Sequence, residues 1–197
     1  MTRYRTLVAD PPWPVRGHTW AKERADTARG NKGRPQGQYQ TMSLDDICAL
    51  TPPLADQAHG YIWAVANHVD WAYSVARAWG LEPVILWTWR KPGRGVGRFA
   101  CNTEYVLVGR RGSRHGNPFG NTAEKYRSAV PGTCFDWPRG KHSEKPDQFF
   151  GLVESLSPGP RLELFARKPR LGWDVWGNEV TVALALNAIL QGKAGSP

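Results

Sequence analysis

The chain has 197 residues, of which 41% are hydrophobic and 22% charged. This length and mixture predict one globular domain over residues 1–197, and they exclude a disordered chain, a collagen-like repeat and a disulfide scaffold. No apolar stretch approaches the roughly 20 residues that cross a bilayer, and the first residues do not form a signal peptide. We therefore expect a cytoplasmic protein with no membrane association.

The net charge of +9 is concentrated in two segments. Residues 14–40 hold six Lys and Arg against two acidic residues, and residues 90–115 hold seven against one. The stretches 14–40 and 90–102 are also rich in glycine and follow no hydrophobic period, which is typical of mobile loops. Two basic loops on a nearly neutral body favour a nucleic-acid partner.

Short apolar segments alternate with helix-like ones along the chain. In chain order, we expect a strand at 4–9, a helix capped by Ser43 and running through residue 50, a strand at 60–66, a helix at 69–79 stopped by Gly80, strands at 83–89 and 104–109, a mostly irregular stretch at 112–141, a helix at 145–156, a strand at 161–166 and a helix at 181–190. This alternation predicts an α/β fold, with a mostly parallel sheet, helices on both faces and ligands beyond the carboxyl ends of the strands.

The cysteines and histidines do not indicate a metal site. Cys48, Cys101 and Cys134 lie far apart and match no zinc spacing, and the five histidines form no ligand motif. The glycine series at 93–97 is followed by a strand-like segment, so it lacks the helix N-terminus of a dinucleotide-binding loop.

The basic residues around this glycine series suggest contacts with a nucleic-acid backbone. Lys91, Arg94 and Arg98 lie among flexible glycines, where their side chains can follow phosphates. The alternative is a basic hairpin connection without a ligand.

The tetrapeptide Asp10-Pro11-Pro12-Trp13 directly follows the first predicted strand. The two prolines lack backbone N–H groups, so the turn offers carbonyl acceptors beside a carboxylate and an indole. We expect Asp10 and the Pro11 carbonyl to accept the two hydrogens of an exocyclic amine while Trp13 stacks on its ring. Two acceptors would free the nitrogen lone pair for attack; the alternative is an ordinary turn with a packing tryptophan.

The chain resembles the MT-A family of adenine N6-methyltransferases, named for the seventy-kilodalton catalytic subunit of the messenger-RNA enzyme, in its bacterial or phage form. The resemblance runs through DPPW at 10–13, YQTMS at 39–43, IW at 62–63, WRKPGRGVGR at 89–98, NTEYVLVGRRG at 102–112, HSEKPD at 142–147 and LELFARKPRLGWDVWGNE at 162–179. It implies a Rossmann-like class I methyltransferase fold with a permuted motif order, and S-adenosylmethionine as the cofactor.

The resemblance also implies roles for individual residues. The catalytic residues would be Asp10, Pro11, Pro12 and Trp13. Besides the basic loop residues, the acceptor side would include Tyr39 and Glu104. The cofactor would be bound by Asp10, Lys145, Arg167, Asn178 and Glu179. Larger relatives use a segment upstream of DPPW for the adenine pocket, whereas nine residues precede Asp10 here, so we expect residues 176–179 to build that end.

The first hypothesis is therefore methylation of the N6 amine of adenine in DNA. The same reaction on RNA, methylation of the cytosine amine, and a catalytically silent nucleic-acid-binding protein are the alternatives. The intact DPPW motif, Lys145 and Asn178 favour an active enzyme. A homodimer or a partner subunit is compatible with either.

Overall fold

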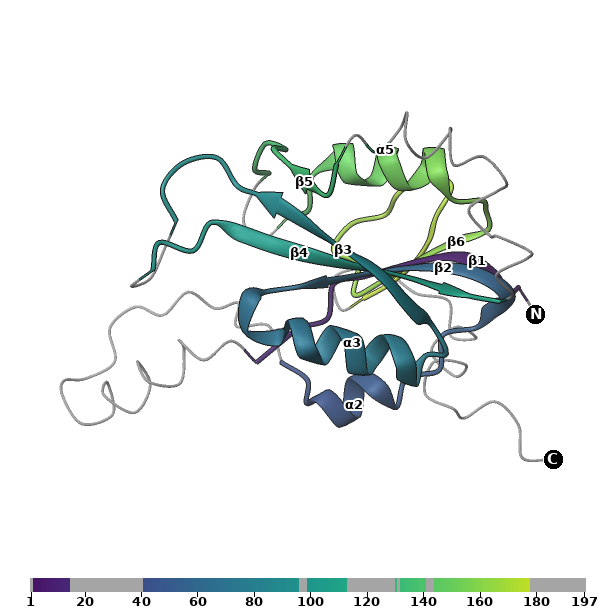
Figure 1. The fold of residues 1–197 in the computed structure, drawn as a ribbon. Helices are drawn as coiled ribbons and strands as arrows, with labels where there is room; N and C mark the ends of the chain where they lie inside the picture. Colours follow the sequence, from purple (N-terminus) through teal and green to yellow (C-terminus); the bar gives the residue numbers. More distant parts are fainter. Residues whose placement is uncertain are drawn as a thin grey trace, which may run out of the picture.

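A seven-stranded β-sheet forms the centre of the computed structural model (Figure 1). The structure describes residues 2–14, 41–95, 99–112, 130, 132–140 and 144–177. The strands are β1 (Tyr4–Ala9), β2 (Leu54–Ala64), β3 (Glu82–Arg90), β4 (Thr103–Arg111), β5 (Cys134–Phe135), β6 (Arg161–Leu164) and β7 (Asp174–Trp176). Their order in the sheet is β5-β3-β4-β2-β1-β6-β7.

The sheet is mostly parallel, as predicted. β1 pairs in parallel with β2 and β6, β6 with β7, and β3 with β5, whereas β4 runs antiparallel to both β2 and β3. β4 is reversed because a hairpin connection, and not a crossover helix, joins it to β3. The amino end of β4 therefore lies at the edge where the other strands have their carboxyl ends.

Helices cover both faces of the sheet, which confirms the expected layers. α2 (Leu44–Cys48) and α3 (Val69–Ala78) lie on one face and α5 (Asp147–Leu156) on the other, while a 3-10 turn, η1 (Ala66–His68), leads into α3 (Figure 1). The chain leaves α3 at Gly80, whose φ of +73° is a conformation that favours glycine, so the predicted stop is confirmed.

Side chains that alternate along the central strands build two apolar layers. Leu7 and Ile62 pack on the α2 and α3 side, whereas Val8, Tyr61 and Trp63 pack on the α5 side. Each of these residues is at most 1% exposed. Because the carboxyl-terminal parts of β1 and β2 are buried on both faces, residues 7–9 and 61–64 are continuous apolar runs without polar alternation.

Several sequence expectations need correction or lie outside the described residues. The stretch 112–141, expected to be mostly irregular, contains the two-residue strand β5, and β7 was not expected; both are too short to show a hydrophobic period. β2 starts at Leu54 and not at residue 60. The predicted helix at 181–190 and most of the 14–40 loop lie outside the described residues. No helix in the described segments is long and apolar enough to span a membrane.

Candidate active site

Four charged residues from separate segments meet at the carboxyl edge of the sheet. Asp10 directly follows β1, Lys91 follows β3, Glu104 is the second residue of β4, and Lys145 stands just before α5. Glu104 reaches this edge because β4 is the reversed strand.

The ammonium group of Lys145 bridges two carboxylates. Its Nζ lies 3.0 Å from Oδ1 of Asp10 and 2.9 Å from Oε2 of Glu104. Lys91 pairs with Oε1, the other oxygen of Glu104. The four side chains are only 12% to 22% exposed, so each charge depends on its neighbours for compensation. We refer to Asp10, Lys91, Glu104 and Lys145 as the charge cluster.

Aromatic rings support both lysines of the charge cluster. The Lys145 ammonium lies 4.9 Å from the ring centroid of Trp63, and that of Lys91 lies 5.1 Å from the centroid of Trp89. Rings at this distance attract a cation through their quadrupole. The two tryptophans are buried in the core, at 0% and 3% exposed.

The charge cluster gives its two carboxyl groups different pKa values. Burial raises the pKa of the Asp10 carboxyl and the charge of Glu104 adds to this rise, although Lys145 opposes it. Burial also acts on Glu104, but Lys145 and Lys91 together hold the pKa of that carboxyl below its ordinary value. Burial disfavours the Lys145 charge, yet Asp10 and Glu104 keep its pKa above the usual range. Asp10 is thus the more basic of the two carboxylates.

One oxygen of Asp10 remains available to a ligand. Lys145 contacts Oδ1, whereas no hydrogen bond from a described residue reaches Oδ2, and the side chain is 22% exposed. The Pro11 carbonyl is used internally, because it accepts the backbone N–H of Trp13 at 2.8 Å in a buried turn. The expectation that Pro11 accepts the second amine hydrogen therefore depends on a carbonyl that already has a partner.

Trp13 lies in the core and does not present the open stacking surface expected from the sequence. The residue is 5% exposed, and its Nε1 donates to the backbone oxygen of Trp63 at 3.0 Å. Its ring stacks on His68 at 6.0 Å and meets Trp71 edge-on. A core-packing tryptophan, the alternative reading of the motif, describes this placement better, because the indole anchors the turn that carries Asp10.

Glu163 is a residue of this edge that the sequence interpretation did not single out. It lies on β6, beside β1, and the charge of Asp10 acts on it. Burial raises its pKa to about 7, with Arg170 opposing the shift. Its Oε2 is buried without a hydrogen-bond partner in the described segments and lies 3.6 Å from Nε of Arg170. The residue occurs inside the LELFARKPR motif, so the motif could have drawn attention to it.

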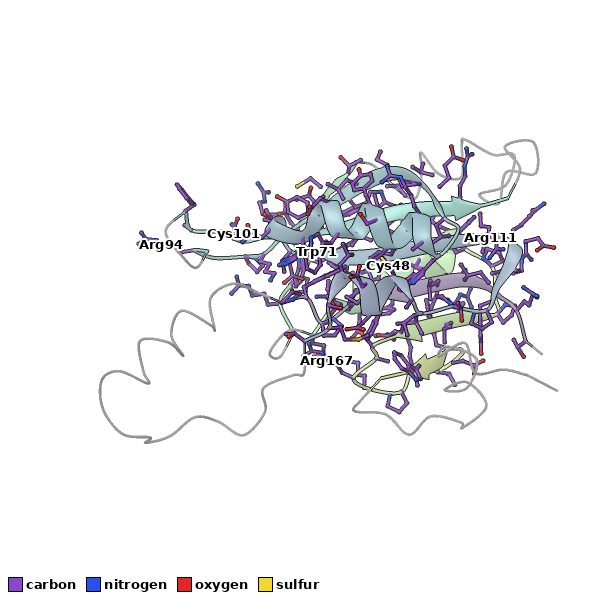
Figure 2. The ribbon with its side chains drawn as sticks, turned by 90° about the horizontal axis from the view of Figure 1, so that it is seen from below. Cys48, Trp71, Arg94, Cys101, Arg111 and Arg167 are labelled. Atoms are coloured by element: carbon purple, nitrogen blue, oxygen red, sulfur yellow. The ribbon has the colours of Figure 1, made fainter. Side chains whose placement is uncertain are left out.

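The remaining predicted residues divide into three groups. Arg167 lies near enough to lower the pKa of Asp10, and Figure 2 shows it at the same end of the molecule as Arg94, away from Arg111. Arg94 is exposed and has no ion pair with a described residue, whereas Lys91 is engaged by Glu104. The predicted residues outside the described ranges are Tyr39, Arg98, Asn178 and Glu179.

The described residues contain no group of three or more His, Cys, Asp or Glu that could hold a metal ion.

Comparisons with known proteins agree on one family. A family model described as MT-A70 matches residues 4–179. The type II methyltransferase M.MunI from Mycoplasma sp is 27% identical over 191 residues, which cover 90% of this chain and 78% of that protein. The human N(6)-adenosine-methyltransferase catalytic subunit METTL3 is 25% identical, over 90% of this chain but 28% of its own length. The N6-methyladenosine RNA methyltransferase MTA1 from Cryphonectria parasitica is 31% identical, over 88% of this chain and 51% of that protein.

Proposed function

Since this chain belongs to the MT-A70 family of adenine N6-methyltransferases, we propose that it transfers a methyl group from S-adenosylmethionine to the N6 amine of adenine in DNA. The observation that carries the proposal is the carboxylate of Asp10, with Oδ1 held by Lys145 and Oδ2 open to a ligand. A carboxylate oxygen at this edge is a suitable acceptor for an amine hydrogen.

Asp10 performs two tasks in this proposal. Its Oδ2 accepts a hydrogen bond from the adenine amine, which reduces delocalisation of the nitrogen lone pair into the ring. Transfer would form a bond between the nitrogen and the methyl carbon and break the bond between that carbon and sulfur, which would keep the electron pair; one amine hydrogen must then leave as a proton. Oδ2 of Asp10 receives it, and the raised pKa of this carboxyl favours the transfer.

The other members of the charge cluster are positioning residues. Lys145 fixes the orientation of the Asp10 carboxylate, and Lys91 and Lys145 hold Glu104 through both of its oxygens. Trp13 anchors the turn from inside the core. A reacting group held in one orientation avoids the entropic cost of finding it during the reaction.

The residues at this edge fit S-adenosylmethionine. When bound, this cofactor supplies an electrophilic methyl group on a positively charged sulfur. Its ammonium and sulfonium charges need anionic neighbours, for which Glu163 is the candidate: its Oε2 is buried and has the Arg170 guanidinium, at 3.6 Å, as a charged neighbour. Its carboxylate needs a cation, for which Arg167 is the candidate, because Lys145, the residue expected from the sequence, is engaged by Asp10 and Glu104. Residues 178 and 179, proposed for the nucleoside end, lie outside the described residues.

The extent of the similarity supports DNA as the polymer. The chain covers 78% of M.MunI, whereas it covers only 28% of METTL3, whose name specifies the ribonucleoside adenosine. RNA is the second candidate, because MTA1, named as an RNA methyltransferase, is 31% identical to this chain. The exposed Arg94 suits either polymer, since phosphates are common to both.

The test is methyl transfer by the purified protein. It is incubated with isotope-labelled S-adenosylmethionine and, separately, with unmethylated genomic DNA and with RNA transcribed from the same DNA. We expect labelled N6-methyladenine in the DNA reaction. Label found only in RNA would exclude the DNA proposal, and label in neither polymer would favour a silent nucleic-acid-binding protein.

A further inference from the structure

Phe99 is the only exposed aromatic residue among the described ones. It is 91% exposed, while every other described Phe, Trp and Tyr is buried or half-buried. Of the described aromatic rings, this one alone is left on the surface, despite the gain that burial would bring. The ring is therefore available to a partner.

The backbone segments before and after Phe99 approach each other closely at Gly95 and Ala100, and we call this close approach the neck. A Cβ on Gly95 would lie 1.9 Å from the carbonyl oxygen of Ala100, so the two segments touch backbone to backbone. Ala100 adopts the left-handed conformation, with φ +48°, which is uncommon for a residue with a side chain. Below the neck, the N–H of Lys91 donates to the carbonyl of Asn102 at 2.7 Å. These contacts fix where the chain carrying Phe99 returns to the sheet.

The neck lies close to the candidate active site. Phe99 precedes Glu104 by five residues, so even a fully extended chain would separate them by no more than about 18 Å. In Figure 2, Arg94 and Cys101 mark the same loop, which projects from the end of the molecule that also carries Arg167.

The surroundings of Phe99 favour nucleic acid over a protein partner. Arg94 beside the neck is exposed without an ion pair to a described residue, so it adds positive charge next to the ring. Among the described residues, the other exposed large hydrophobic side chains are elsewhere: Val84 and Ile85 lie toward the amino end of β3, and Leu171 follows β6. A protein interface needs a contiguous apolar patch, whereas a single ring beside basic side chains suits stacked bases.

We propose that Phe99 inserts between the bases of a paired nucleic acid, next to the adenine that moves into the charge cluster. The inference rests on the function proposed above and adds that the substrate is base-paired. An adenine inside a duplex must leave the stack before its amine can react, and this leaves a gap beside its former neighbours. An aromatic side chain that enters the stack compensates for part of the lost stacking.

The test compares two forms of one substrate. The purified chain, as wild type, Phe99→Ala and Phe99→Trp, methylates unmethylated genomic DNA that is either native or heat-denatured, and N6-methyladenine is measured by mass spectrometry. Because alanine cannot stack, Phe99→Ala should lower the rate on native DNA by about tenfold or more. On denatured DNA the loss should stay below about threefold, since few bases there must leave a stack. Phe99→Trp should retain the wild-type rate on both forms.

Val84→Ala is the matched control, because it removes an exposed apolar side chain toward the opposite end of β3, and it should change neither rate. Wild-type activity of Phe99→Ala on native DNA, or equal losses on both forms, would overturn the inference. So would conversion of a dimer into a monomer by Phe99→Ala in light scattering, which would assign the ring to a second copy of the chain.

Failure of the proposed function gives a different pattern. If the wild type methylates no nucleic acid, fluorescence anisotropy with a labelled DNA duplex still measures the contact, and Phe99→Ala should weaken binding by about tenfold. If the wild type methylates RNA alone, the same comparison is made with a folded hairpin RNA and its unfolded form. If the measured affinity or methylation rate of Phe99→Ala equals that of the wild type, the role of Phe99 is overturned.

Discussion

The Nζ atom of Lys145 lies 3.0 Å from Oδ1 of Asp10, although the two residues are 135 positions apart in the chain. Lys145 stands just before α5 and Asp10 just after β1, so their contact joins the helix layer to the carboxyl edge of the sheet. The same ammonium group contacts Glu104. One lysine therefore orients the carboxylate that we propose to be catalytic and compensates a second one.

Asp10→Asn should remove transfer while leaving the fold and the binding of S-adenosylmethionine largely intact. The amide keeps the shape of the side chain, and Lys145 keeps Glu104 as a partner. Losing a charge-assisted hydrogen bond and the proton acceptor should cost about 3 kcal/mol or more, which lowers the rate about 100-fold. Single-turnover kinetics and titration calorimetry on the same preparation measure both effects. Near-wild-type transfer would remove Asp10 from the mechanism.

Lys145→Met should destabilise the protein, because it leaves Asp10 and Glu104 without their shared cation. Removing one partner of a buried pair typically lowers the free energy of unfolding by about 3 to 5 kcal/mol. Lys168→Met is the control: Lys168 is 47% exposed and pairs with Glu144 at the surface, so its loss should cost about 1 kcal/mol or less. Urea unfolding compares the two variants. If both variants lost the same small free energy of unfolding, Lys145 would not stabilise the charge cluster.

The layers of the fold could be predicted from the sequence, but the contacts inside the site could not. Apolar runs such as the one in β1 predict strands that are buried on both faces, and the turn at Asp10 follows such a run. By contrast, the pairing of Lys91 with Glu104 depends on the reversal of β4, which brings the start of one strand beside the end of another. The burial of Trp13 likewise depends on where η1 places His68.

Lys91 and Arg94 should differ in how they affect binding to nucleic acid. Lys91 is engaged by Glu104, whereas Arg94 is exposed. Arg94→Ala should therefore flatten the plot of log affinity against log salt by roughly 0.9 for a DNA duplex, while Lys91→Ala should leave the slope unchanged and lower the rate of transfer. Fluorescence anisotropy titrations at several salt concentrations measure the slope for each variant. Equal flattening by both variants would place Lys91 at a phosphate.

Glu163 should make the stability of the protein depend on pH. Its pKa is about 7 in the folded protein, above the ordinary 4.5, so folding favours the protonated form. The contribution of this group to stability is fully present below pH 4.5 and is lost as the pH rises through 7. Glutamine cannot ionise. The free energy of unfolding of Glu163→Gln should therefore exceed that of the wild type by roughly 1 kcal/mol at pH 5 and by roughly 3 kcal/mol at pH 8. Thermal unfolding measured at both pH values tests this, and an identical pH dependence in the two proteins would contradict it.

The central claim, methylation of adenine N6 in DNA by a mechanism that needs Asp10, is tested most directly in the nucleosides of an expressing host. DNA and RNA are purified from methylation-deficient cells that express the wild type, Asp10→Asn or neither protein, and are digested for mass spectrometry. We predict N6-methyldeoxyadenosine in the DNA of cells with the wild type, and background levels with Asp10→Asn. The absence of this nucleoside from wild-type DNA, or its equal abundance with Asp10→Asn, would contradict the claim.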